Sequence, residues 1–311
     1  MKGEIEKVYK ILKTTVNIEI DLRNYLSIAV ERPIKAVIPN TYLNISHKTL
    51  YRIFDILGIK TNYITNAEVP YLTTDSEDIG RIPIYKYGLY YIMELASVLP
   101  LYIWRDTINK EKIILDIAAA PGGKTYLLSN IFREGVVVAN EPNRVRLRRL
   151  RNNIQKYLLP NVVITQYKGE KFPKNLVFDI ILFDAPCSGI NLIYKRRREV
   201  LSNLRRSREY GDLQKKIISN IYDLLVDGGE LLYITCTLSK YECEEVVKHA
   251  IKSGFEAIEI SKKLPFNTIK PEDRDYPELS KTHYILPTLN KEKFSGNIGT
   301  AYVALLRKSG S

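Results

Sequence analysis

Short apolar runs alternate with helical segments from about residue 110 to the end of this 311-residue chain. The runs, most of them rich in β-branched residues, are Lys112–Ile117, Val136–Asn140, Asn161–Thr165, Asp179–Phe183, Glu230–Thr235, Phe255–Ile260 and Ala301–Leu306. Between most of them apolar residues recur every three to four positions, as they do from Leu147 to Leu158, which predicts helices with one buried face. Strands that are apolar throughout and alternate with helices are typical of a parallel sheet covered on both faces. We therefore expect an α/β fold built on a doubly wound, seven-stranded sheet.

The N-terminal third of the chain shows a weaker pattern. Ile34–Ile38, a helix near His47–Leu57 and Thr61–Thr65 could form a small β-α-β unit with helices beside it. At one domain per roughly 100–200 residues, a chain of this length holds about two domains. We expect a smaller N-terminal α+β domain over residues 1–85 and the larger α/β domain over residues 86–311.

One connection in the α/β part is unusually long. Ile269–Gly299 joins the last two expected strands, contains three prolines and shows little periodicity. Because structureless connections of this length are usually functional or mobile, we expect one or the other here.

The chain carries a strong positive charge. Its 47 Lys and Arg outnumber its 35 Asp and Glu, which gives a formal net charge of +12. The excess lies in residues 144–208, which contain 16 basic side chains and only 4 acidic ones. Such a charge favours a polyanionic partner, either nucleic acid or an anionic membrane surface. Hydrophobic residues at 45% and charged residues at 26% argue against disorder, collagen and coiled coil.

The sequence offers no segment for a membrane and no set of metal ligands. No stretch of about 18 uncharged apolar residues is present, because Glu94 interrupts the best candidate, Tyr87–Trp104. The N-terminus is too charged for a secretion signal. The 3 cysteines form no Cys-x-x-Cys pair and no histidine has ligand spacing, so neither a disulfide framework nor a metal site is expected. We expect a soluble cytoplasmic protein, a monomer, without a membrane contact or a metal.

A glycine-rich turn, DIAAAPGGKT at 116–125, follows the first strand of the α/β part. Gly122 and Gly123 remove side chains where the backbone must approach a ligand, and the helix that begins near Lys124 presents unpaired N–H groups. The spacing matches neither the P-loop nor the dinucleotide-binding fingerprint. A plain tight turn between strand and helix is the alternative interpretation.

An acidic residue, Glu141, ends the second strand, 25 residues after Asp116. Folds of this kind bind ribose hydroxyls at that position. The simpler alternative is an acid favoured by the dipole of the following helix, and the two interpretations are compatible. Together the glycine-rich turn and Glu141 point to an adenosine-containing ligand.

Two cysteines follow the fourth and fifth expected strands. Cys187 lies in DAPCSG close to Asp184, and Cys236 lies in TCT. If the two strands are neighbours, about 4.8 Å apart, both thiols reach one cleft at the carboxyl ends of the sheet. A single free cysteine is usually a small core residue, and we keep that interpretation for Cys243. Two thiols at adjacent strand ends beside an acid indicate a chemical role instead.

Methyl transfer to a pyrimidine base is a reaction that uses two thiols and an acid. Carbon 5 of the base is too electron-poor to take a methyl group directly, and a thiolate that adds to carbon 6 makes it nucleophilic. After transfer the proton on carbon 5 must leave and the thiol must be expelled, which suits the second cysteine. An acid near the base edge can hold a proton at N3.

At these residues the chain resembles a known family, the RNA 5-methylcytosine methyltransferases of the NOL1/NOP2/Sun type, which use S-adenosylmethionine. The matching segments are DIAAAPGGKT at 116–125, ANEPNRVRLRRLRNN at 139–153, FDAPCSG at 183–189, the segment from LQ to EEVV at 213–247, and GTAYVALLRK at 299–308. YYIMELASVLP at 90–100 is similar to the segment that precedes the family's methyltransferase domain. The resemblance covers about residues 90–308 and implies a Rossmann-like methyltransferase sheet.

The resemblance also implies a role for each matching residue. The residues that would line the S-adenosylmethionine site are Ala118, Ala119, Ala120, Pro121, Gly122, Gly123, Lys124, Glu141, Arg146 and Asp184. Residues 118–124 would wrap the methionine part, Glu141 would hold the ribose, and Asp184 would also reach the target cytosine. Cys236 would be the nucleophile and Cys187 would assist product release. Related DNA enzymes use the Pro-Cys cysteine as nucleophile, so spacing alone leaves that choice open.

The chain departs from the family pattern at Ala118 and at Lys168. Ala118 stands where the family often has cysteine, a harmless change at a position that contacts the ligand through its backbone. Lys168 stands where an Asp usually follows the third strand, and a lysine cannot accept a hydrogen bond from the adenine amine. Either Glu170 takes that place, or packing and backbone groups hold the adenine.

A basic run of Lys195, Arg196, Arg197 and Arg198 follows shortly after Cys187. A run of charge is often a solvated face. Its position beside the expected cleft favours contact with RNA phosphates. RNA is therefore the expected partner, with tRNA favoured and rRNA open, and the N-terminal domain is expected to contact it.

Three functions remain open from the sequence. The leading one is an RNA cytosine-C5 methyltransferase that acts through a covalent Cys–cytosine intermediate. The second, motivated by Lys168, is a catalytically silent RNA-binding protein of the same fold. The third is a methyltransferase for a small molecule or a protein, which would need neither two strand-end thiols nor a basic segment.

Overall fold

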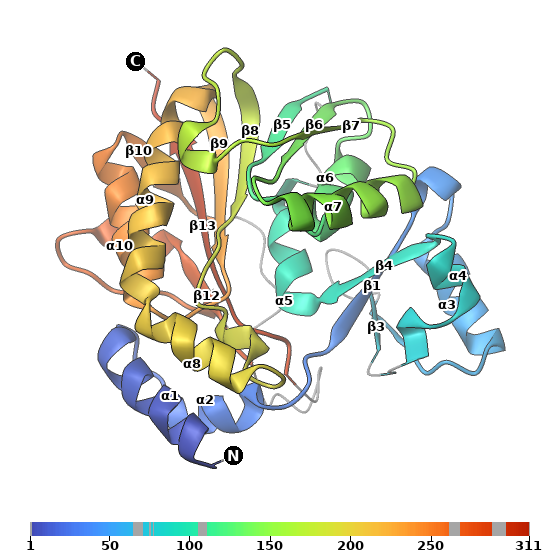
Figure 1. Ribbon diagram of the computed structural model, residues 1–311, viewed down its shortest axis with the longest axis horizontal. Helices are drawn as coiled ribbons and strands as arrows, with labels where there is room; N and C mark the ends of the chain where they lie inside the picture. The colour runs from blue at the N-terminus through green and yellow to red at the C-terminus, as the bar shows by residue number, and fades with distance from the viewer. Residues whose placement is uncertain are drawn as a thin grey trace. The chain divides into compact units, whose positions relative to one another are not determined.

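All seven strands expected after residue 110 are present (Figure 1). They are β5 (Ile113–Asp116), β6 (Val136–Asn140), β7 (Val162–Thr165), β8 (Phe178–Asp184), β9 (Leu225–Thr235), β10 (Phe255–Ile258) and β13 (Ala301–Lys308). The helices among them are α6 (Gly123–Ile131), α7 (Arg144–Lys156), α8 (Arg197–Arg205), α9 (Ser207–Leu224) and α10 (Glu244–Lys252). β9 begins at Leu225, ahead of the expected Glu230, and the pairing register shifts between these two residues. The alternation confirms the predicted α/β class.

The structure, a computed structural model, describes residues 2–64, 71–74, 76, 78–104, 111–260, 268–287 and 297–310. Two compact units divide the chain: residues 1–33 with 167–311 form the first, and residues 34–166 form the second. Within the described ranges, no helix combines the length and the apolar character that a membrane span requires.

The second unit begins with a four-stranded antiparallel sheet in the order β2-β3-β1-β4. The strands are β1 (Lys35–Pro39), β2 (Asn62–Ile64), β3 (Tyr71–Thr74) and β4 (Tyr90–Glu94); the helices are α3 (His47–Ile56), α4 (Pro83–Lys86) and α5 (Leu95–Val98). The expected β-α-β order is present as β1-α3-β2, but β3 lies between the two strands and pairs with both. Thr65, at the end of the second expected strand, lies outside the described residues. The sheet includes β4 and so continues past residue 85; the division into domains after that residue stays a prediction.

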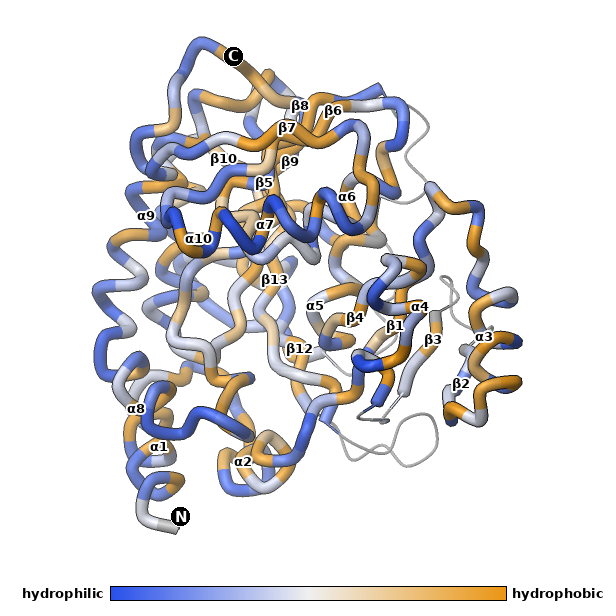
Figure 2. Tube along the Cα trace, turned by 45° about the vertical axis from the view of Figure 1, so that its right-hand side comes forward, coloured by the Kyte–Doolittle hydropathy of each residue, from blue (hydrophilic) through white to orange (hydrophobic). Residues whose placement is uncertain are grey.

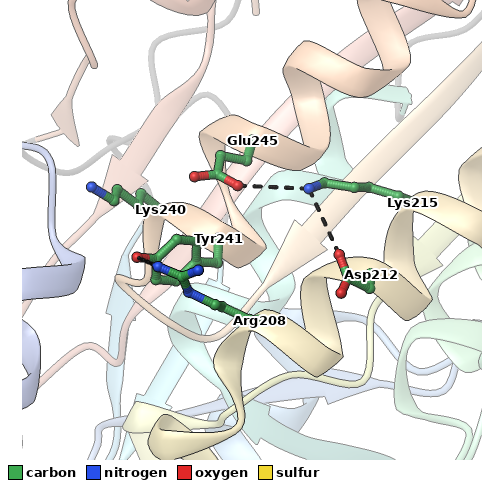
Figure 3. Close-up of a pocket in the computed structure, with 6 residues that line it drawn as sticks. All are labelled: Arg208, Asp212, Lys215, Lys240, Tyr241 and Glu245. Atoms are coloured by element: carbon green, nitrogen blue, oxygen red, sulfur yellow. Dashed lines mark hydrogen bonds and ion pairs between the residues drawn. The ribbon is translucent and has the colours of Figure 1, made fainter.

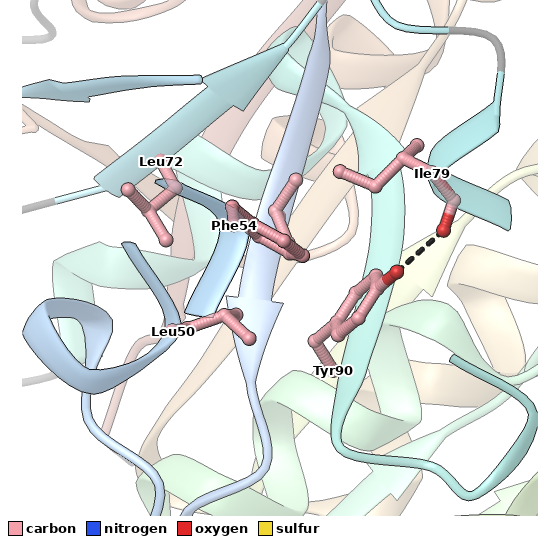
Figure 4. Close-up of a cluster of buried hydrophobic side chains, with 6 residues drawn as sticks. Leu50, Phe54, Leu72, Ile79 and Tyr90 are labelled. Atoms are coloured by element: carbon pink, nitrogen blue, oxygen red, sulfur yellow. Dashed lines mark hydrogen bonds between the residues drawn. The ribbon is translucent and has the colours of Figure 1, made fainter. Parts of the chain in front are cut away.

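The core of this sheet is a cluster of buried side chains (Figure 4). Its fully buried members are Val37, Leu50, Phe54, Leu72, Ile79 and Tyr90. Leu50 and Phe54 are four residues apart on α3, so both point to the same face of the helix. The Tyr90 hydroxyl donates a hydrogen bond of 2.5 Å to the Ile79 carbonyl, which satisfies the one polar group that the Tyr90 side chain brings into the core.

The same unit continues with three parallel strands in the order β5-β6-β7. Leu147 and Leu150 of α7 pack on Ala119 and Ala139 at the ends of this sheet. The outward side of α7 is strongly hydrophilic (Figure 2). Leu158, expected on the apolar face, instead lies beyond the end of the helix, where its φ of +52° turns the chain and leaves the side chain exposed.

The first unit contains β8 and β9, which are parallel, and β13, which runs antiparallel beside β9. The expectation of a parallel sheet is therefore wrong for β13 and for β10, which is also antiparallel to β13. The other edge of β13 pairs with β10 at one end and with β12 (His283–Ile285) at the other, and β11 (Thr268–Ile269) pairs with β12. The long connection after Ile269 is therefore not structureless in its described part, because backbone hydrogen bonding to β13 orders it; residues 288–296 lie outside the described ranges. The N-terminal helices α1 (Lys2–Thr15) and α2 (Leu22–Ala29) also belong to this unit, and α1 packs on α8.

A buried joint ties the small sheet of the second unit to the end of α7. The Asn40 side-chain amide, fully buried, donates hydrogen bonds to the carbonyls of Gly88 at 2.9 Å and of Tyr157 at 3.0 Å. Gly88 has a φ of +75°, and a Cβ atom added there would collide with the carbonyl oxygen of Lys156. A glycine is required at this position for both reasons.

Replacing Gly88 by alanine is expected to lower the free energy of unfolding. The left-handed backbone alone costs about 1–2 kcal/mol for an alanine, and the overlap with Lys156 adds about 1–3 kcal/mol. Gly58→Ala is the matched control, because Gly58 has a φ of +67° and nothing within 4 Å of the added Cβ. Urea denaturation of the two variants measures the difference, and equal losses of stability would show that the joint tolerates a side chain.

Candidate active site

Two thiols meet at the carboxyl ends of β8 and β9. The strands are parallel neighbours with Asp184 opposite Ile234, and the Ala185 N–H continues the pairing to the Ile234 carbonyl at 2.9 Å. Cys187 lies in the loop after β8, and Cys236 follows β9 directly. Their Sγ atoms are 2.9 Å apart, and the Cys236 backbone N–H donates to the Cys187 sulfur at 3.4 Å. Both side chains are half-buried and neither forms a disulfide, so the structure brings the two predicted cysteines together as thiols.

The third cysteine is part of the core. Cys243 is fully buried, and its sulfur contacts the Thr235 hydroxyl and the Thr237 carbonyl. Burial raises the pKa of the Cys243 thiol well above its ordinary value, so the reactive thiolate is disfavoured. This environment agrees with the interpretation of Cys243 as a small core residue.

A buried carboxyl group lies behind the Cys187 loop. Glu242, on the short 3₁₀ helix η6 (Lys240–Glu242), is fully buried, and its Oε2 accepts a hydrogen bond of 2.8 Å from the Ser188 N–H. Its Oε1 has no hydrogen-bond partner among the described residues. Burial raises the pKa of Glu242 to about 7, although hydrogen bonds from Ser188 and Gln214 oppose the shift. No sequence signal predicts a role for Glu242, because only the tertiary fold brings it behind a loop 54 residues away.

In the second unit the glycine-rich turn leads from β5 into α6, and the predicted cofactor residues 118–124 all lie in it or in the first turn of α6. Gly122 has a φ of +107° directly before the helix, a conformation that favours glycine. The Ala119 N–H donates to the Asn140 carbonyl at 2.8 Å, and the Asn140 side-chain amide donates to the Ile117 carbonyl at 3.0 Å. These bonds fix the turn against the end of β6.

Glu141 is a buried acid tied to the same turn. It is 1% exposed, and its Oε1 accepts a hydrogen bond of 2.8 Å from the Asn143 N–H. Its Oε2 has no hydrogen-bond partner among the described residues and lies 3.4 Å from Arg146 Nη1. Arg146 Nη2 donates to the Ala120 carbonyl at 2.7 Å, so one guanidinium holds the acid and the turn together. The second unit thus brings Glu141, Arg146 and residues 118–124 into one group, with a buried acceptor oxygen available to a ligand hydroxyl.

Lys168 is exposed, directly before the 3₁₀ helix η4 (Gly169–Lys171) of the first unit. The Asn220 side chain of α9 donates to the carbonyls of Gly169 at 2.9 Å and of Phe172 at 3.2 Å, which fixes this turn. Glu170 is half-buried. The two alternatives for holding an adenine, Glu170 or packing with backbone groups, stay predictions.

The basic run after Cys187 is largely paired within the chain. Arg196 Nη1 lies 3.2 Å from Glu199, and Arg198 Nε lies 2.9 Å from Glu4. Arg197 is half-buried, and the Lys195 ammonium lies 4.8 Å from the centre of the Tyr194 ring. Carboxylates therefore already neutralise two of the four cations that the sequence predicts as RNA contacts.

The exposed arginines of α7 have a different environment. The helix contains no acidic residue, and it exposes Arg144, Arg148, Arg149 and Arg151. None of the four forms an ion pair with any residue in the described ranges. Arg144, Arg148 and Arg151 are spaced by four and three positions, so they lie on one face of the helix.

A polar hollow of about 440 Å³ lies on the surface of the first unit (Figure 3). It is lined by Arg208, Asp212, Lys215, Lys240, Tyr241 and Glu245. The Arg208 guanidinium stacks on the Tyr241 ring at 4.4 Å and donates to its hydroxyl at 2.7 Å, while Lys215 lies 3.6 Å from Glu245. These contacts join α9 to η6 and α10 at the surface.

A protein-family model described as 16S rRNA methyltransferase RsmB/F matches residues 104–294. The 25S rRNA (cytosine-C(5))-methyltransferase nop2 of Schizosaccharomyces pombe is 31% identical over 242 residues, which cover 74% of this chain and 38% of the relative. The ribosomal RNA small subunit methyltransferase F of Escherichia coli is 31% identical over 258 residues, which cover 78% of this chain and 52% of the relative. The chain therefore spans about half or less of the length of these curated relatives.

Two solved structures from Pyrococcus horikoshii share the fold over almost the whole chain. A methyltransferase homolog has a TM-score of 0.74 at 24% identity and covers 99% of both chains. The structure of NSun6 with SFG has a TM-score of 0.75 at 19% identity and covers 99% of this chain and 98% of that one. The likeness confirms the predicted Rossmann-like methyltransferase fold.

The buried Glu242 is expected to make stability depend on pH. In the unfolded chain the residue ionises around its ordinary pKa of 4.5, and in the folded chain only around 7. Ionisation therefore favours the unfolded chain, so the contribution of Glu242 to stability is fully present below pH 4.5 and is lost as the pH rises through about 7. The expected loss is about 3 kcal/mol.

Glu242→Gln keeps an acceptor for the Ser188 N–H without a titrating group, so it should lack this loss. Urea denaturation between pH 4.5 and pH 8 compares the two proteins, and parallel stability profiles would contradict the raised pKa.

Proposed function

The chain belongs to the RsmB/F family of RNA methyltransferases, and we propose that it transfers a methyl group from S-adenosylmethionine to carbon 5 of a cytosine in RNA. The observation that carries the proposal is the pair of thiols, 2.9 Å apart, at the ends of the parallel strands β8 and β9. A methyltransferase for a small molecule or a protein would not need two such thiols. A tRNA is the substrate that the sequence favours, whereas the names of the curated relatives favour an rRNA. Bisulfite sequencing of RNA from cells that lack the gene distinguishes the two. A cytoplasmic location and a monomeric state stay predictions.

The residues of the second unit fit S-adenosylmethionine, which supplies an electrophilic methyl group on a sulfonium centre. The Oε2 of Glu141, which lies near Arg146 but accepts no hydrogen bond among the described residues, is suited to accept one from a ribose hydroxyl, because an ionised carboxylate is only an acceptor. Residues 118–124 would hold the methionine part through their backbone, and Arg146 would keep both groups in place through its contacts with Glu141 and Ala120. The NSun6 structure holds SFG, an analogue of S-adenosylmethionine, which supports this assignment.

In the proposed reaction Cys236 is the nucleophile. Its thiolate adds to carbon 6 of the cytosine and the electron pair moves to carbon 5, which then takes the methyl group. Asp184, partly buried at the end of β8, would hold a proton at N3 and so assist the addition. Cys187 would help to remove the proton from carbon 5, after which the electron pair of that C–H bond re-forms the double bond and expels the Cys236 sulfur. The 2.9 Å between the sulfurs supports two roles at one base.

RNA contact is proposed for the exposed face of α7 as well as for Lys195, Arg196, Arg197 and Arg198. Phosphate binding releases counterions only if the cation is not already neutralised by a carboxylate. Arg196 and Arg198 would first have to leave Glu199 and Glu4, whereas the α7 arginines have no such partner in the described ranges. The face of Arg144, Arg148 and Arg151 is therefore the stronger candidate.

Replacing Glu141 by alanine is expected to weaken binding of S-adenosylmethionine by about 1–3 kcal/mol, because ribose hydroxyls would lose their buried acceptor. Isothermal titration calorimetry measures the affinity. Glu134→Ala, a substitution of another acid in the same unit, serves as the control and should bind the cofactor normally. Unchanged affinity in Glu141→Ala would remove Glu141 from the site.

Replacing Cys236 and replacing Cys187 by alanine are expected to block different steps of the reaction. Cys236→Ala should transfer no methyl group and form no adduct with RNA. Cys187→Ala should still attack and methylate, and then stall as a protein–RNA complex that survives denaturing electrophoresis, because release is blocked. Labelled S-adenosylmethionine and a denaturing gel measure both outcomes.

The control for this pair is the double variant Cys187→Ala/Cys236→Ala, which should bind the cofactor normally. An adduct trapped by Cys236→Ala would reverse the two roles. Full activity in both single variants would show that the reaction is not covalent.

Replacing Arg148 and Arg151 together by alanine is expected to weaken RNA binding and to lower its salt dependence by about 0.7–0.9 in log–log slope for each lost phosphate contact. The matched variant Arg196→Ala/Arg198→Ala removes the same charge from ion-paired positions and should have a smaller effect. Filter binding at several salt concentrations compares the two, and a larger change in the second variant would favour the basic run over α7.

A further inference from the structure

The loop that carries Cys187 is held by a buried side chain on each side of the cysteine. Gln214 Nε2, on α9, donates a hydrogen bond of 2.8 Å to the carbonyl of Pro186. Glu242 Oε2, on η6, accepts one of 2.8 Å from the N–H of Ser188. Gln214, Ser188 and Glu242 are all fully buried. The residues before and after Cys187 are thus fixed by two different elements of the first unit.

The same network reaches the strand of Cys236. The Tyr233 hydroxyl, on β9, lies 3.0 Å from Gln214 Oε1 and 2.6 Å from the backbone carbonyl of Glu242. The hydroxyls of Ser188 and Thr237, the residues that follow the two cysteines, are 2.7 Å apart. The relative position of the two thiols is therefore determined by buried hydrogen bonds as well as by strand pairing.

Close packing of α9 on η6 makes the network possible. Gly211 lies one helical turn before Gln214, and a Cβ atom added to it would collide with the carbonyl oxygen of Tyr241. Without a side chain at Gly211 the helix approaches the backbone next to Glu242, so that Gln214 and Glu242 both reach the Cys187 loop. The contacts of Arg208 with Tyr241 close this interface at the surface (Figure 3).

Packing alone does not account for a carboxyl group at position 242. Burying an acid with one oxygen unpartnered costs free energy, and an apolar side chain of similar size would pack there at lower cost. The hydrogen bond that Glu242 accepts from the Ser188 N–H, by contrast, fixes the loop in one direction and at one distance. A carboxyl group at position 242 therefore suits the orientation of the Cys187 loop better than the stability of the fold.

We propose that Gln214 and Glu242 are positioning residues, which hold the Cys187 loop so that the Cys187 thiol acts at the base bound by Cys236. The inference rests on the proposed function, because it assigns the two residues to the release step of that reaction. Loosening the loop should therefore reproduce the loss of Cys187 and leave attack by Cys236 intact.

The test compares three variants in the full chain with labelled S-adenosylmethionine and substrate RNA. Glu242→Leu should transfer one methyl group per protein, lose turnover by about 100-fold, and accumulate the denaturation-resistant complex as Cys187→Ala does. Glu242→Gln should release product at close to the rate of the unaltered protein, because its amide oxygen still accepts from Ser188.

Glu244→Leu is the matched control. Glu244 is also a buried acid with one bonded oxygen, but it accepts its hydrogen bond from the Tyr284 hydroxyl at 2.7 Å rather than from the Cys187 loop. It should lose stability without accumulating the complex. Equal accumulation in Glu242→Leu and Glu244→Leu, or none in Glu242→Leu, would overturn the proposal.

A second measurement needs no RNA and so separates this inference from the proposed function. Diamide takes up two electrons and two protons as two thiols become a disulfide, and mass spectrometry follows the Cys187–Cys236 bond. The unaltered protein and Glu244→Leu should form the Cys187–Cys236 disulfide rapidly, since the two sulfurs are 2.9 Å apart. Glu242→Leu should form it at least about 10-fold more slowly. If Cys187→Ala does not stall, the proposed function fails while the diamide rates still test the positioning. Equal rates of disulfide formation in Glu242→Leu and the unaltered protein would overturn the positioning role of Glu242.

Discussion

Parallel pairing between β8 and β9 is the constraint on which the candidate chemistry depends. The register places Asp184 opposite Ile234, and the strands end together, so two residues 49 positions apart come within reach of one base. No local property of either segment provides this proximity. The pairing is protected because both strands are buried and β13 continues the sheet beyond β9. A shift of β9 by one residue against β8 would turn the side chains of β9 to the other face of the sheet and so separate the two thiols.

Buried acids recur in both units with one oxygen satisfied and the other without a hydrogen bond. Glu141 accepts a hydrogen bond from the N–H of Asn143, the residue directly before α7, and its second oxygen is suited to a ligand. Glu242 bonds the Cys187 loop through Ser188, and its raised pKa reduces the cost of leaving its second oxygen unpartnered. In each case a carboxyl group is buried at a cost in stability, and the hydrogen bond that it makes orients a loop next to the candidate site. The proposed roles of the two acids, ligand binding for Glu141 and loop positioning for Glu242, differ because their hydrogen-bond partners differ.

The distribution of charge shows why a basic sequence run is a poor guide to a binding surface by itself. Residues 195–198 are the most basic local run after Cys187, yet Glu199 and Glu4 pair with two of its arginines. Glu4 lies 194 residues away from Arg198, so the pair is invisible in the sequence. Arg144, Arg148 and Arg151 of α7 are three or four positions apart in the sequence and share one exposed face only when the helix forms. Availability of the cation, and not its density along the chain, decides which surface suits a polyanion.

The sequence by itself determined the α/β class, all seven strands and the type of residue at the candidate site. Strands and helices follow from local periodicity, and the tight turn at Gly122 follows from the left-handed backbone conformation that glycine permits. Tertiary structure alone decided the place of β3 between β1 and β2, the pairing of β11 and β12 within the long connection, and the position of Leu158 outside its helix. It also decided that Gln214 and Glu242 hold the Cys187 loop. These features depend on contacts between residues far apart in the chain, and the free energy of such contacts has no signature in the local pattern of either partner.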